Sequence, residues 1–596
     1  MAPTTHQVSA DREAVDGAWE GSTMFLDTSA GHRSRRRMLA TGVAAFSAAA
    51  LLLAGCGSGT SKTGSSGGSA RTTANTLIAY TGQSGDYQIN FNPYSPSQIG
   101  GIGTIFESLF FVTNVNSNPP VPLLGTKSTW NKEGTQLDIT LRDGVKWSDG
   151  KPFTATDVKF TFDMLLANPS LNTSGFDGKV KATDPSHIVV SWAHPAFVEG
   201  PTVLGRILIV PEHLWKSINP KTDVMQKPVG TGAFMLSNFK AQAYTLSANP
   251  GYWGGAPKVK ALRYLSLSGN TAGADALKAG TIDWQTGPVP DMANVSKNYS
   301  GYNSITVPQN QVVLGTCSSV ALGCTGPQTD VSVRKAIFYA LDRTQLNSLA
   351  FQNTNSDISP GFALLHSQSD AISPAIPERT APSSPQVAKS AALLEGAGWV
   401  KGADGFYAKD GKPLSLSIEV VSGWTDYITA ITTMSQQLKA AGIKVVASQS
   451  SWNEWTDKKA KGHFQLAIDS LGQGPSNDPY YLYNNYFTTS NTAKVGTAVA
   501  LNFGRFSDTG VDKAVRELEK INPSDKAGRN AQFAIIQKSI VENMPYIPVQ
   551  TGGTTSEFHS AKFTGWPTLK TMYAFPAVWA APDNSEIYKK LVPTGK

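Results

Sequence analysis

The chain has 596 residues, which is too long for a single hydrophobic core and predicts about two to four domains. Hydrophobic residues make up 40% of it and charged residues 16%, the balance of a soluble globular protein. The net charge is +7, but no run of Lys and Arg occurs beyond the N-terminal region. We therefore expect a diffusely basic surface and no nucleic-acid partner.

Residues 1–55 are interpreted as an N-terminal extension and export signal. A cluster of arginines at residues 33–37 precedes an apolar stretch, residues 38–54, that is shorter than a comfortable membrane-spanning helix. The segment SRRRML, residues 34–39, resembles a twin-arginine signal, which would mean export in the folded state. Leu53-Ala54-Gly55-Cys56 resembles a bacterial lipobox, so we expect lipid attachment to Cys56. An uncleaved anchor helix is the alternative, and both interpretations place the rest of the chain outside the cytoplasmic membrane.

Residues 56–75 form a linker rich in Gly, Ser and Thr. Such a composition cannot build a hydrophobic core, because it has too little apolar surface to bury. The linker would let an anchored domain move near the membrane.

The body of the chain begins with short apolar and alternating segments. Residues 75–80, NTLIAY, predict a buried strand, and residues 99–111 predict a helix that enters a core. Residues 137–142 alternate apolar and polar side chains, the period of a half-buried strand. Asp143-Gly144 predicts a turn, and residues 145–147 would be the returning strand.

A helix is predicted to begin after Thr154. Asp157 stands three residues later, so the pair is close to a capping box. Apolar and small side chains then follow at helical spacing, at Val158, Thr161, Phe162 and Leu165. The many charged residues of segment 141–163 therefore have local roles in turns, in the cap and on a solvated face.

Two further cysteines, Cys317 and Cys324, lie in the body of the chain. Outside the cell such a pair can oxidise, and the spacing CSSVALGC predicts a small disulfide loop, with two separate thiols as the alternative. The sequence has no Cys and His cluster with the spacing of a metal site, so we expect no metal.

Catalytic motifs occur only in contexts that do not support them. The G-x-S-x-G match at residues 64–68 lies in the linker, with no predicted strand before it or helix after it. The S-x-x-K match at residues 332–335 follows the K-T-G match at residues 62–64, the wrong order for a penicillin-binding enzyme. No phosphate-binding loop of an ATPase and no H-E-x-x-H occur. We therefore expect no enzymatic activity and no cofactor.

The strand, turn and capped-helix series over residues 137–165 resembles the signature of the extracellular solute-binding proteins of family 5. This is the oligopeptide, dipeptide and nickel class that serves ABC importers. Five further segments resemble motifs of this family in the family order: IVPEHLW (209–215), PVGTGAF (228–234, with Ala233 in place of Pro), NPGYW (249–253), ALKAGTID (276–283) and VRKAI to LDR (333–343). The resemblance covers roughly residues 75–596.

The resemblance implies an α/β fold of the periplasmic-binding-protein type, bilobal, of type II and cluster C, with a small additional domain. The ligand cleft would lie between the lobes, which close by a hinge. The expected segments are 76–98, 227–306 and 549–596 for lobe I, 99–226 for the extra domain and 307–548 for lobe II.

Two of the motifs also have structural interpretations. Gly230 and Gly232 fit tight turns that need a positive φ. Val333, Ala336, Ile337, Ala340 and Leu341 make one amphipathic helix face. Arg334, on the same predicted helix, is expected to serve in packing or in an ion pair rather than as a ligand contact.

Peptide binders of this family often hold the ligand's α-ammonium with an Asp shortly before a D/E-P pair. If Asp478-Pro479 is the matching pair, the anchor position falls on Pro475, and neither Gly474 nor Ser476 beside it is acidic. The usual anchor is therefore missing or displaced onto Asp478.

The side chains near this position are aromatic rings and neutral amides. Trp452 and Trp455 stand in the polar segment SWNEWTDKK, so of the tryptophans they are expected to be the most exposed or ligand-facing, with core packing as the alternative. The candidate ligand-binding residues are Trp424, Trp452, Trp455, Gln473, Asn477, Asp478 and Tyr480.

The ligand is expected to be an oligopeptide or dipeptide, because peptides predominate in this family. Aromatic faces with neutral amides also suit an oligosaccharide, and segment 565–579, GWPTLKTMYAFPAVW, looks like the family variants that bind one. Nickel chelates and opines remain further alternatives.

The expected function is that of a lipid-anchored, monomeric, extracytoplasmic solute-binding component of an ABC importer. Lobe closure would capture the ligand and deliver it to a permease, while separate subunits hydrolyse ATP. A secreted hydrolase and a sensor lipoprotein without a transport role are the competing classes.

Overall fold

The computed structural model describes residues 75–595, apart from residues 82–85, 96–97, 173, 423 and 451; the side chains of residues 270, 452 and 453 are also outside the description. These residues belong to one compact unit, Ala70–Lys596. The predicted export signal, Cys56 and nearly all of the predicted linker lie outside the described residues. Within the described part, no helix has the length and apolar character that a membrane crossing requires.

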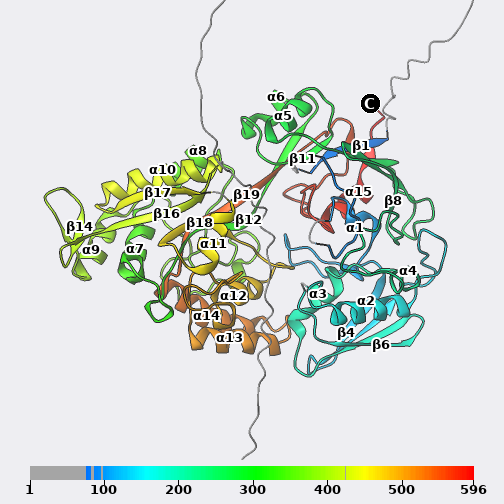
Figure 1. Cartoon of the computed structure of the whole chain (residues 1–596), viewed down its shortest axis with the longest axis horizontal. Helices are drawn as coiled ribbons and strands as arrows, with labels where there is room; N and C mark the ends of the chain where they lie inside the picture. Colours follow the sequence, from blue (N-terminus) through cyan, green and yellow to red (C-terminus); the bar gives the residue numbers. More distant parts are fainter. Residues whose placement is uncertain are drawn as a thin grey trace, which may run out of the picture. The chain divides into compact units, whose positions relative to one another are not determined.

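A mixed sheet of ten strands runs through the unit, in the order β17-β16-β18-β12-β19-β11-β1-β10-β9-β8 (Figure 1). β1 is parallel to β10 and β11, and β16 is parallel to β17 and β18. The strands are β1 (Thr76–Tyr80), β8 (Phe234–Lys240), β9 (Ala243–Ala248), β10 (Ala261–Leu265), β11 (Trp284–Thr286), β12 (Asn303–Thr316), β16 (Ser415–Val421), β17 (Lys444–Ser450), β18 (Leu466–Leu471) and β19 (Tyr546–Phe558).

The long strands β12 and β19 join the two halves of this sheet. They pair antiparallel from Asn303 and Phe558 at one end to Gly315 and Tyr546 at the other. The pairing shifts register in the middle of β12, at two places between Pro308 and Val313. Such irregularities interrupt the ladder and let a strand bend.

The parallel strands of both halves point their carboxyl ends at this midpoint. β18 ends at Leu471, opposite Gln311 of β12, and β11 ends at Thr286, opposite Ser556 of β19. In open α/β sheets, ligands bind in the crevice outside the carboxyl ends of the strands. The topology therefore places one crevice between the two halves.

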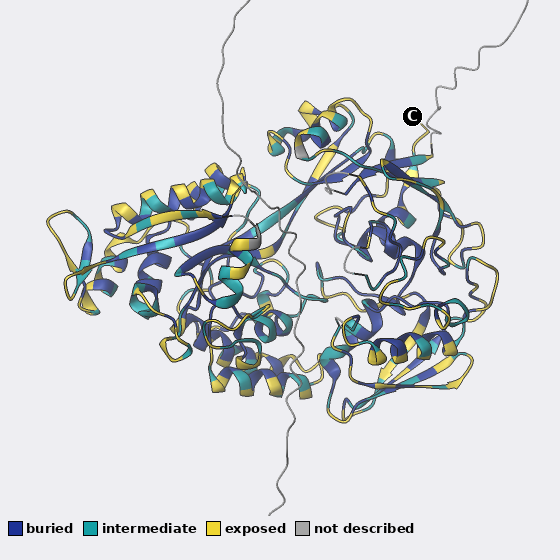
Figure 2. Ribbon diagram, viewed as in Figure 1, coloured by how far each residue is buried: buried dark blue, intermediate teal, exposed yellow. Residues whose placement is uncertain are grey.

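Hydrophobic side chains form two large cores that divide along the same two strands. Val307 of β12 and Phe558 of β19 belong to one core, whereas Val312 and Val549 belong to the other. A smaller cluster lies between β1 and the helix α5 (Asn270–Lys278). Figure 2 shows the central strands of the sheet mostly buried and the outward faces of the surrounding helices exposed, and the edge strand β17 is buried only at Ser450.

Segment 99–226 contains a second, antiparallel sheet in the order β4-β5-β7-β6, with helix α2 packed against it. Both hydrogen bonds of the predicted capping box at Thr154 and Asp157 are present, and the predicted apolar face of α2 is buried. The elements are β4 (Gly125–Trp130), β5 (Gln136–Leu141), α2 (Ala155–Ala167), β6 (Lys179–Asp184) and β7 (His187–Ser191).

Two local predictions in this region are wrong. The helix predicted over residues 99–111 shrinks to α1 (Ile102–Ile105), followed by the short strand β2 (Phe110–Phe111). Glycines at positions 100, 101 and 103 disfavour a longer helix. The returning strand predicted at residues 145–147 is only an isolated bridge between Lys146 and Pro152.

Gly230 and Gly232 are required for a different reason from the predicted one. Neither has a positive φ. Instead, a Cβ atom on Gly230 would lie 1.8 Å from the carbonyl oxygen of Ile105, and one on Gly232 would lie 2.2 Å from that of Thr104. These glycines let two backbone segments approach closely, which no other residue type allows.

Most of the remaining helices belong to the half of the protein that contains strands β16, β17 and β18. Arg334 is buried there and donates hydrogen bonds to the carbonyl oxygens of Gln328 and Asn543, the packing role that was predicted. Cys317 and Cys324 form a disulfide with their Cα atoms 5.5 Å apart. These helices are α7 (Val331–Ala340), α8 (Arg343–Phe351), α9 (Val387–Gly396), α10 (Thr425–Ala440), α11 (Trp452–Lys461), α12 (Pro479–Phe487), α13 (Thr509–Lys520) and α14 (Lys526–Asn543).

The other short elements are α3 (Gly200–Gly205), α4 (Glu212–Trp215), α6 (Val295–Asn298), α15 (Asp583–Lys590), the 3-10 helices η1 (Phe197–Glu199), η2 (Met292–Asn294), η3 (Val320–Leu322), η4 (Pro327–Thr329), η5 (Ser369–Ala371) and η6 (Thr489–Asn491), and the strands β3 (Val121–Pro122), β13 (Val400–Lys401), β14 (Tyr407–Lys409), β15 (Lys412–Pro413), β20 (Phe563–Thr564) and β21 (Val592–Pro593).

Candidate ligand-binding cleft

The predicted ligand-binding residues lie at the carboxyl ends of three neighbouring strands. Trp424 follows β16, Trp452 and Trp455 belong to α11 after β17, and the remaining four follow β18. Residues that are distant in the sequence therefore share one edge of the sheet. We call residues 472–478, between β18 and α12, the β18–α12 loop.

The β18–α12 loop contacts segment 99–226 through two asparagine side chains. Asn114 Nδ2 donates a hydrogen bond to the carbonyl oxygen of Gly474, at 3.1 Å. Asn477 Nδ2 donates to Ser117 Oγ at 3.0 Å, and also to the carbonyl oxygen of Ser367. The loop is thus held against residues from both sides of the crevice.

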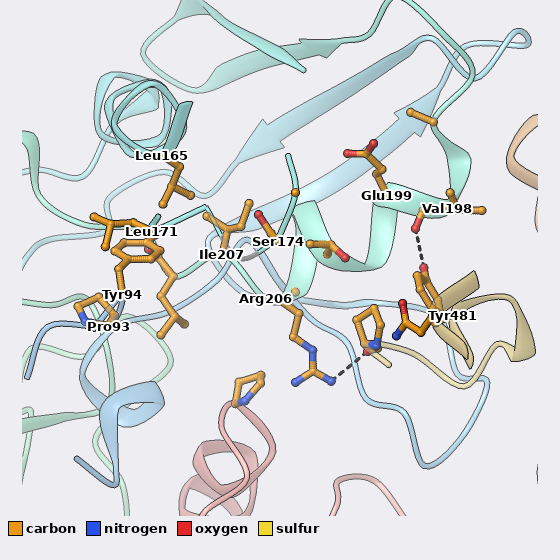
Figure 3. Close-up of a pocket in the computed structure, with 18 of the residues that line it drawn as sticks. Pro93, Tyr94, Leu165, Leu171, Ser174, Val198, Glu199, Arg206, Ile207 and Tyr481 are labelled. Atoms are coloured by element: carbon orange, nitrogen blue, oxygen red, sulfur yellow. Dashed lines mark hydrogen bonds between the residues drawn. The ribbon is translucent and has the colours of Figure 1, made fainter. Parts of the chain in front are cut away.

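Two longer side chains continue this contact (Figure 3). Arg206 Nη2 donates to the carbonyl oxygen of Pro475 at 2.9 Å, and Tyr481 Oη donates to the carbonyl oxygen of Val198 at 2.6 Å. Arg206 Nη1 also reaches the carbonyl oxygen of Ala581 at 3.3 Å. Arg206 therefore joins segment 99–226, the β18–α12 loop and the C-terminal segment.

A cavity of about 810 Å³, here the large cavity, lies beside this contact. Figure 3 shows Tyr94, Leu165 and Leu171 gathered on one side of it and Glu199 and Tyr481 on the other. Its ionisable walls are His194, Glu199, Arg206 and Glu519, with the rings of Tyr94, Tyr480 and Tyr481. The large cavity therefore offers groups of both charges together with aromatic surface.

Burial changes the protonation of the two glutamates in the large cavity. Glu199 accepts a hydrogen bond from Trp192 Nε1 at 3.2 Å, and burial, with Asp177 nearby, raises the pKa of its carboxyl to about 7. Glu519 accepts from Tyr480 Oη at 3.1 Å, and burial raises its pKa as well. Both carboxyl groups are thus easier to protonate than exposed glutamates.

One group of side chains near this cavity has the atom types of a metal site. Oxygen and nitrogen atoms of Asp177, His194 and Glu199 lie within 4.8 Å of one another. Asp177 and His194 are exposed and already pair with each other at 3.1 Å. This pairing satisfies the imidazole, and we assign no ion to the group.

A second cavity, of about 560 Å³, lies on the other side of the β18–α12 loop. Asn477 and Ser367 contribute to its lining, with Pro308 of β12 and Lys570 near the C-terminus. Burial lowers the pKa of His366, another lining residue, so its imidazole is neutral at neutral pH.

A third cavity, of about 600 Å³, lies along the β12–β19 pair and is here the hinge cavity. Trp424 and Trp579 both line it, and 52% of Trp579 is exposed. Among the described residues, Asp426 is the sole charged one in its lining. The hinge cavity therefore combines aromatic faces with neutral polar groups.

The structure separates six of the predicted residues into two sets. Trp424, Asn477 and Tyr480 each line one of the three cavities, whereas Gln473, Trp455 and Asp478 line none of them. Trp579 was not predicted as a site residue; its place in segment 565–579 was the only signal for it in the sequence.

The expectation that Trp455 is exposed is wrong. Only 1% of its surface is exposed, its ring centroid lies 5.2 Å from that of Trp424, and Lys459 Nζ lies 4.1 Å from the ring. α11 is mostly polar and packs against β16, so Trp455 supplies the apolar contact on its inner face. The side chain of Trp452 lies outside the described part.

Asp478 has structural partners for both carboxylate oxygens. Its Oδ1 accepts from the backbone N–H of Tyr480 at 2.9 Å and caps the N-terminus of α12. Its Oδ2 pairs with Arg529 Nη2 at 2.5 Å. Asp478 lines none of the three cavities.

Comparison with known proteins gives the chain a family. The family model described as bacterial extracellular solute-binding proteins, family 5 Middle, matches residues 119–493. Protein XP55 of Streptomyces lividans is 27% identical over 425 residues, 70% of this chain and 72% of that protein. A putative ABC transporter peptide-binding protein of Brucella ovis is 26% identical over 527 residues, 83% of this chain and 92% of that protein.

Solved structures show the same fold. A periplasmic oligopeptide-binding protein of an ABC transporter from Thermotoga maritima has a TM-score of 0.78 and 22% identity, and covers 88% of this chain and 100% of its own. A structure of that protein with mannohexaose bound has a TM-score of 0.71 and 22% identity, and covers 88% of this chain and 99% of its own. The predicted α/β fold of a periplasmic binding protein is confirmed.

Proposed function

The chain belongs to the bacterial extracellular solute-binding proteins of family 5, and we propose that it captures an oligopeptide or dipeptide for an ABC importer. Proteins of this family are extracytoplasmic and bind solutes without chemical conversion. The protein works as a monomer, is anchored to the outer face of the cell membrane through Cys56, and delivers its ligand to a permease.

The topology of the crevice carries this proposal. Strands of both halves end at the midpoint of the β12–β19 pair, and the β18–α12 loop at that midpoint contacts segment 99–226. A solute that contacts both halves of the protein across the crevice favours the closed arrangement, in which the two halves lie together. Its binding energy then drives closure, because a ligand shifts an equilibrium only by its differential affinity for the two states.

The charges of the large cavity support a peptide. A peptide is a zwitterion, and its α-ammonium group needs a carboxylate while its carboxylate needs a cation. Glu199 and Glu519 supply the first, and Arg206, whose Nε has no partner among the described residues, supplies the second. A zwitterionic ligand adds charged partners to these partly desolvated groups, which a neutral ligand cannot do.

A thermal-shift screen of the mature protein tests this proposal. Short peptides with free termini should raise the melting temperature, and the same peptides with acetylated and amidated termini should do so less. Glu519→Gln should weaken binding of the free peptides, whereas Glu517→Gln, on the exposed face of the same helix, is the matched control. Failure of every peptide to stabilise the protein would contradict the peptide assignment.

An oligosaccharide is the second candidate, and the hinge cavity favours it. Trp424 and Trp579 offer aromatic faces on which the C–H faces of a sugar ring can stack, and Asp426 is the sole charged residue among the described ones there. The related protein of Thermotoga maritima was solved with mannohexaose. Stabilisation by mannohexaose that is lost in Trp579→Ala, without stabilisation by peptides, would replace the peptide assignment with this one.

The membrane anchor and the absence of catalysis have separate tests. Cys56→Ala should release the protein from the membrane fraction, because the acceptor for the lipid is gone. Incubation of the purified protein with peptides or mannohexaose should return them intact. Turnover of either would support a secreted hydrolase, and growth on the transported solute without this chain would support a sensor lipoprotein.

A further inference from the structure

Buried glutamines lie where the β18–α12 loop, β12 and segment 99–226 meet. Gln309 on β12 and Gln473 in the β18–α12 loop are 4% and 2% exposed. Gln309 Nε2 donates to the carbonyl oxygen of Asn114 at 3.4 Å, and Asn114 Nδ2 in turn donates to the carbonyl oxygen of Gly474, the residue after Gln473. Asn114 thus links the two glutamines.

Each of these glutamines has one amide atom without a hydrogen-bond partner in the described part of the chain. The atoms are Gln309 Oε1, an acceptor, and Gln473 Nε2, a donor. Buried polar groups in proteins are nearly always hydrogen-bonded, so such atoms call for a partner. Gln311, two residues along β12, differs: its Nε2 donates to the carbonyl oxygen of Phe362 and its Oε1 accepts from Thr551.

Residues near the two glutamines in the chain line different cavities. Gln309 follows Pro308, which lines the 560 Å³ cavity, and Gln473 lies two residues before Pro475, which lines the large cavity. The β18–α12 loop contributes to both linings, through Pro475 and Asn477, so an extended ligand that reached from one cavity into the other would have to cross this loop. The hydrogen bonds of Asn114 to Gly474 and of Asn477 to Ser117 hold the loop and would give way to such a ligand.

We propose that Gln309 and Gln473 bind one backbone amide of a peptide that spans the two cavities. Gln473 Nε2 donates to the carbonyl oxygen of the peptide, and Gln309 Oε1 accepts from its N–H. A secondary amide has one donor and one acceptor, so it satisfies both unmet atoms. The proposal rests on the proposed function, because it assumes a peptide ligand.

Backbone methylation of the peptide tests directly whether its N–H groups are recognised. A methylated nitrogen has no hydrogen to donate, so Gln309 Oε1 would stay unmet. The probes are an equimolar mixture of random pentapeptides and the same mixture methylated at every backbone nitrogen, with retention measured by native mass spectrometry. The wild-type protein should retain the unmethylated mixture about 5- to 100-fold better, the range expected for one unmet buried hydrogen bond.

Three variants complete the experiment. Gln309→Met should lose most of the preference for unmethylated peptides, and Gln473→Met should weaken retention of both mixtures. Gln311→Met, at a buried position of the same strand and with the same loss of an amide, is the matched control and should keep the wild-type preference. Melting temperatures of the ligand-free proteins verify that each variant folds. If Gln309→Met does not fold, Gln309→Leu is used in its place.

The two ways in which this experiment can fail are distinguishable. If the wild-type protein retains neither mixture, the proposed peptide function is wrong and this inference falls with it. If it retains peptides but shows no preference, or if Gln309→Met keeps the wild-type preference, the amide-binding role of this pair is wrong and the peptide function stands. An ordered water bridging the two glutamines in the peptide-bound state would also overturn the inference.

Discussion

Glu557 is a buried carboxyl group whose protonation should affect stability. It lies on β19 with no exposed surface, and its described partner is Gln285 Nε2, at 3.3 Å. Glu557 Oε1 and Gln285 Oε1 are both buried acceptors without a donor in the described part of the chain. A protonated Glu557 supplies such a donor, and burial raises its pKa from 4.5 to about 8.

The sign and the size of the effect follow from that pKa. Between pH 4.5 and about 8 the folded protein keeps the proton of Glu557 and the unfolded chain does not. Stability therefore falls as the pH rises through this range. At 1.36 kcal/mol per pH unit the loss reaches about 5 kcal/mol. With about 2.1 cal/mol/K of unfolding entropy per residue, the roughly 510 residues that the structure describes convert this into a fall of about 5 °C in melting temperature.

Glu557→Gln should remove this pH dependence, because the amide has nearly the same shape and carries no charge. Melting temperatures of the variant and the wild-type protein, measured by differential scanning fluorimetry from pH 5 to pH 8.5, should agree at pH 5 and diverge by several degrees at pH 8. Parallel curves over the whole range would refute the argument.

A matched control is available in Glu107. This carboxylate is also buried, but it accepts hydrogen bonds from Thr231, Tyr252 and Trp253 at 2.8–2.9 Å. Glu107→Gln places an N–H group among these donors. Burial raises the pKa of Glu107 too, but its three donors favour the ionised form, so Glu107→Gln should lower the melting temperature at pH 8, where Glu557→Gln should raise it.

Three further variants test the packing and the charges described above. Gly230→Ala drives a Cβ atom into a backbone carbonyl and should cost at least about 1–3 kcal/mol in urea unfolding, whereas Gly396→Ala, with open space around it, should not destabilise the protein. Arg529→Met leaves Asp478 without its ion-pair partner and should cost about 3 kcal/mol, and an unchanged urea midpoint would show that the pair is unimportant. Because the pKa of Glu199 is raised to about 7, the wild-type protein should lose stability as the pH rises from 4.5 towards 7. Glu199→Gln should flatten the profile of melting temperature against pH in this range. A variant profile as steep as that of the wild-type protein would contradict this role of Glu199.

Local features of this chain can be predicted from the sequence because residues close together in the chain determine them. The cap of α2 is an example: Thr154 and Asp157 are three residues apart, and their hydrogen bonds need only the first turn of the helix. Most of the family motifs belong to the same class, although Gly230 in PVGTGAF does not. Their turns and helix faces recur in a fixed order, so the fold was predictable without any contact between distant residues.

Non-local contacts account for two of the predictions that were wrong. Gly230 must be glycine because its backbone lies against the carbonyl oxygen of Ile105, more than a hundred residues away in the chain. Its sequence context suggested a turn instead. Trp455 stands in a polar segment, and only the docking of α11 on β16 decides that its ring is buried. The partnership of Gln309 and Gln473 likewise depends on two strands that meet in the sheet, not on any spacing in the sequence.

β19, which pairs with both β12 and β11, comes near the end of the chain, and this order affects how the protein folds during synthesis. The buried residues of the core that contains Val312 and Val549 all lie between these two positions, so this core can close as soon as β19 begins to emerge from the ribosome. The other core needs Phe558 and residues up to Leu591, and β11 has no partner on one side until β19 arrives. The half that is translated second can therefore fold first, and a chain truncated before Tyr546 exposes strand edges of both halves to aggregation.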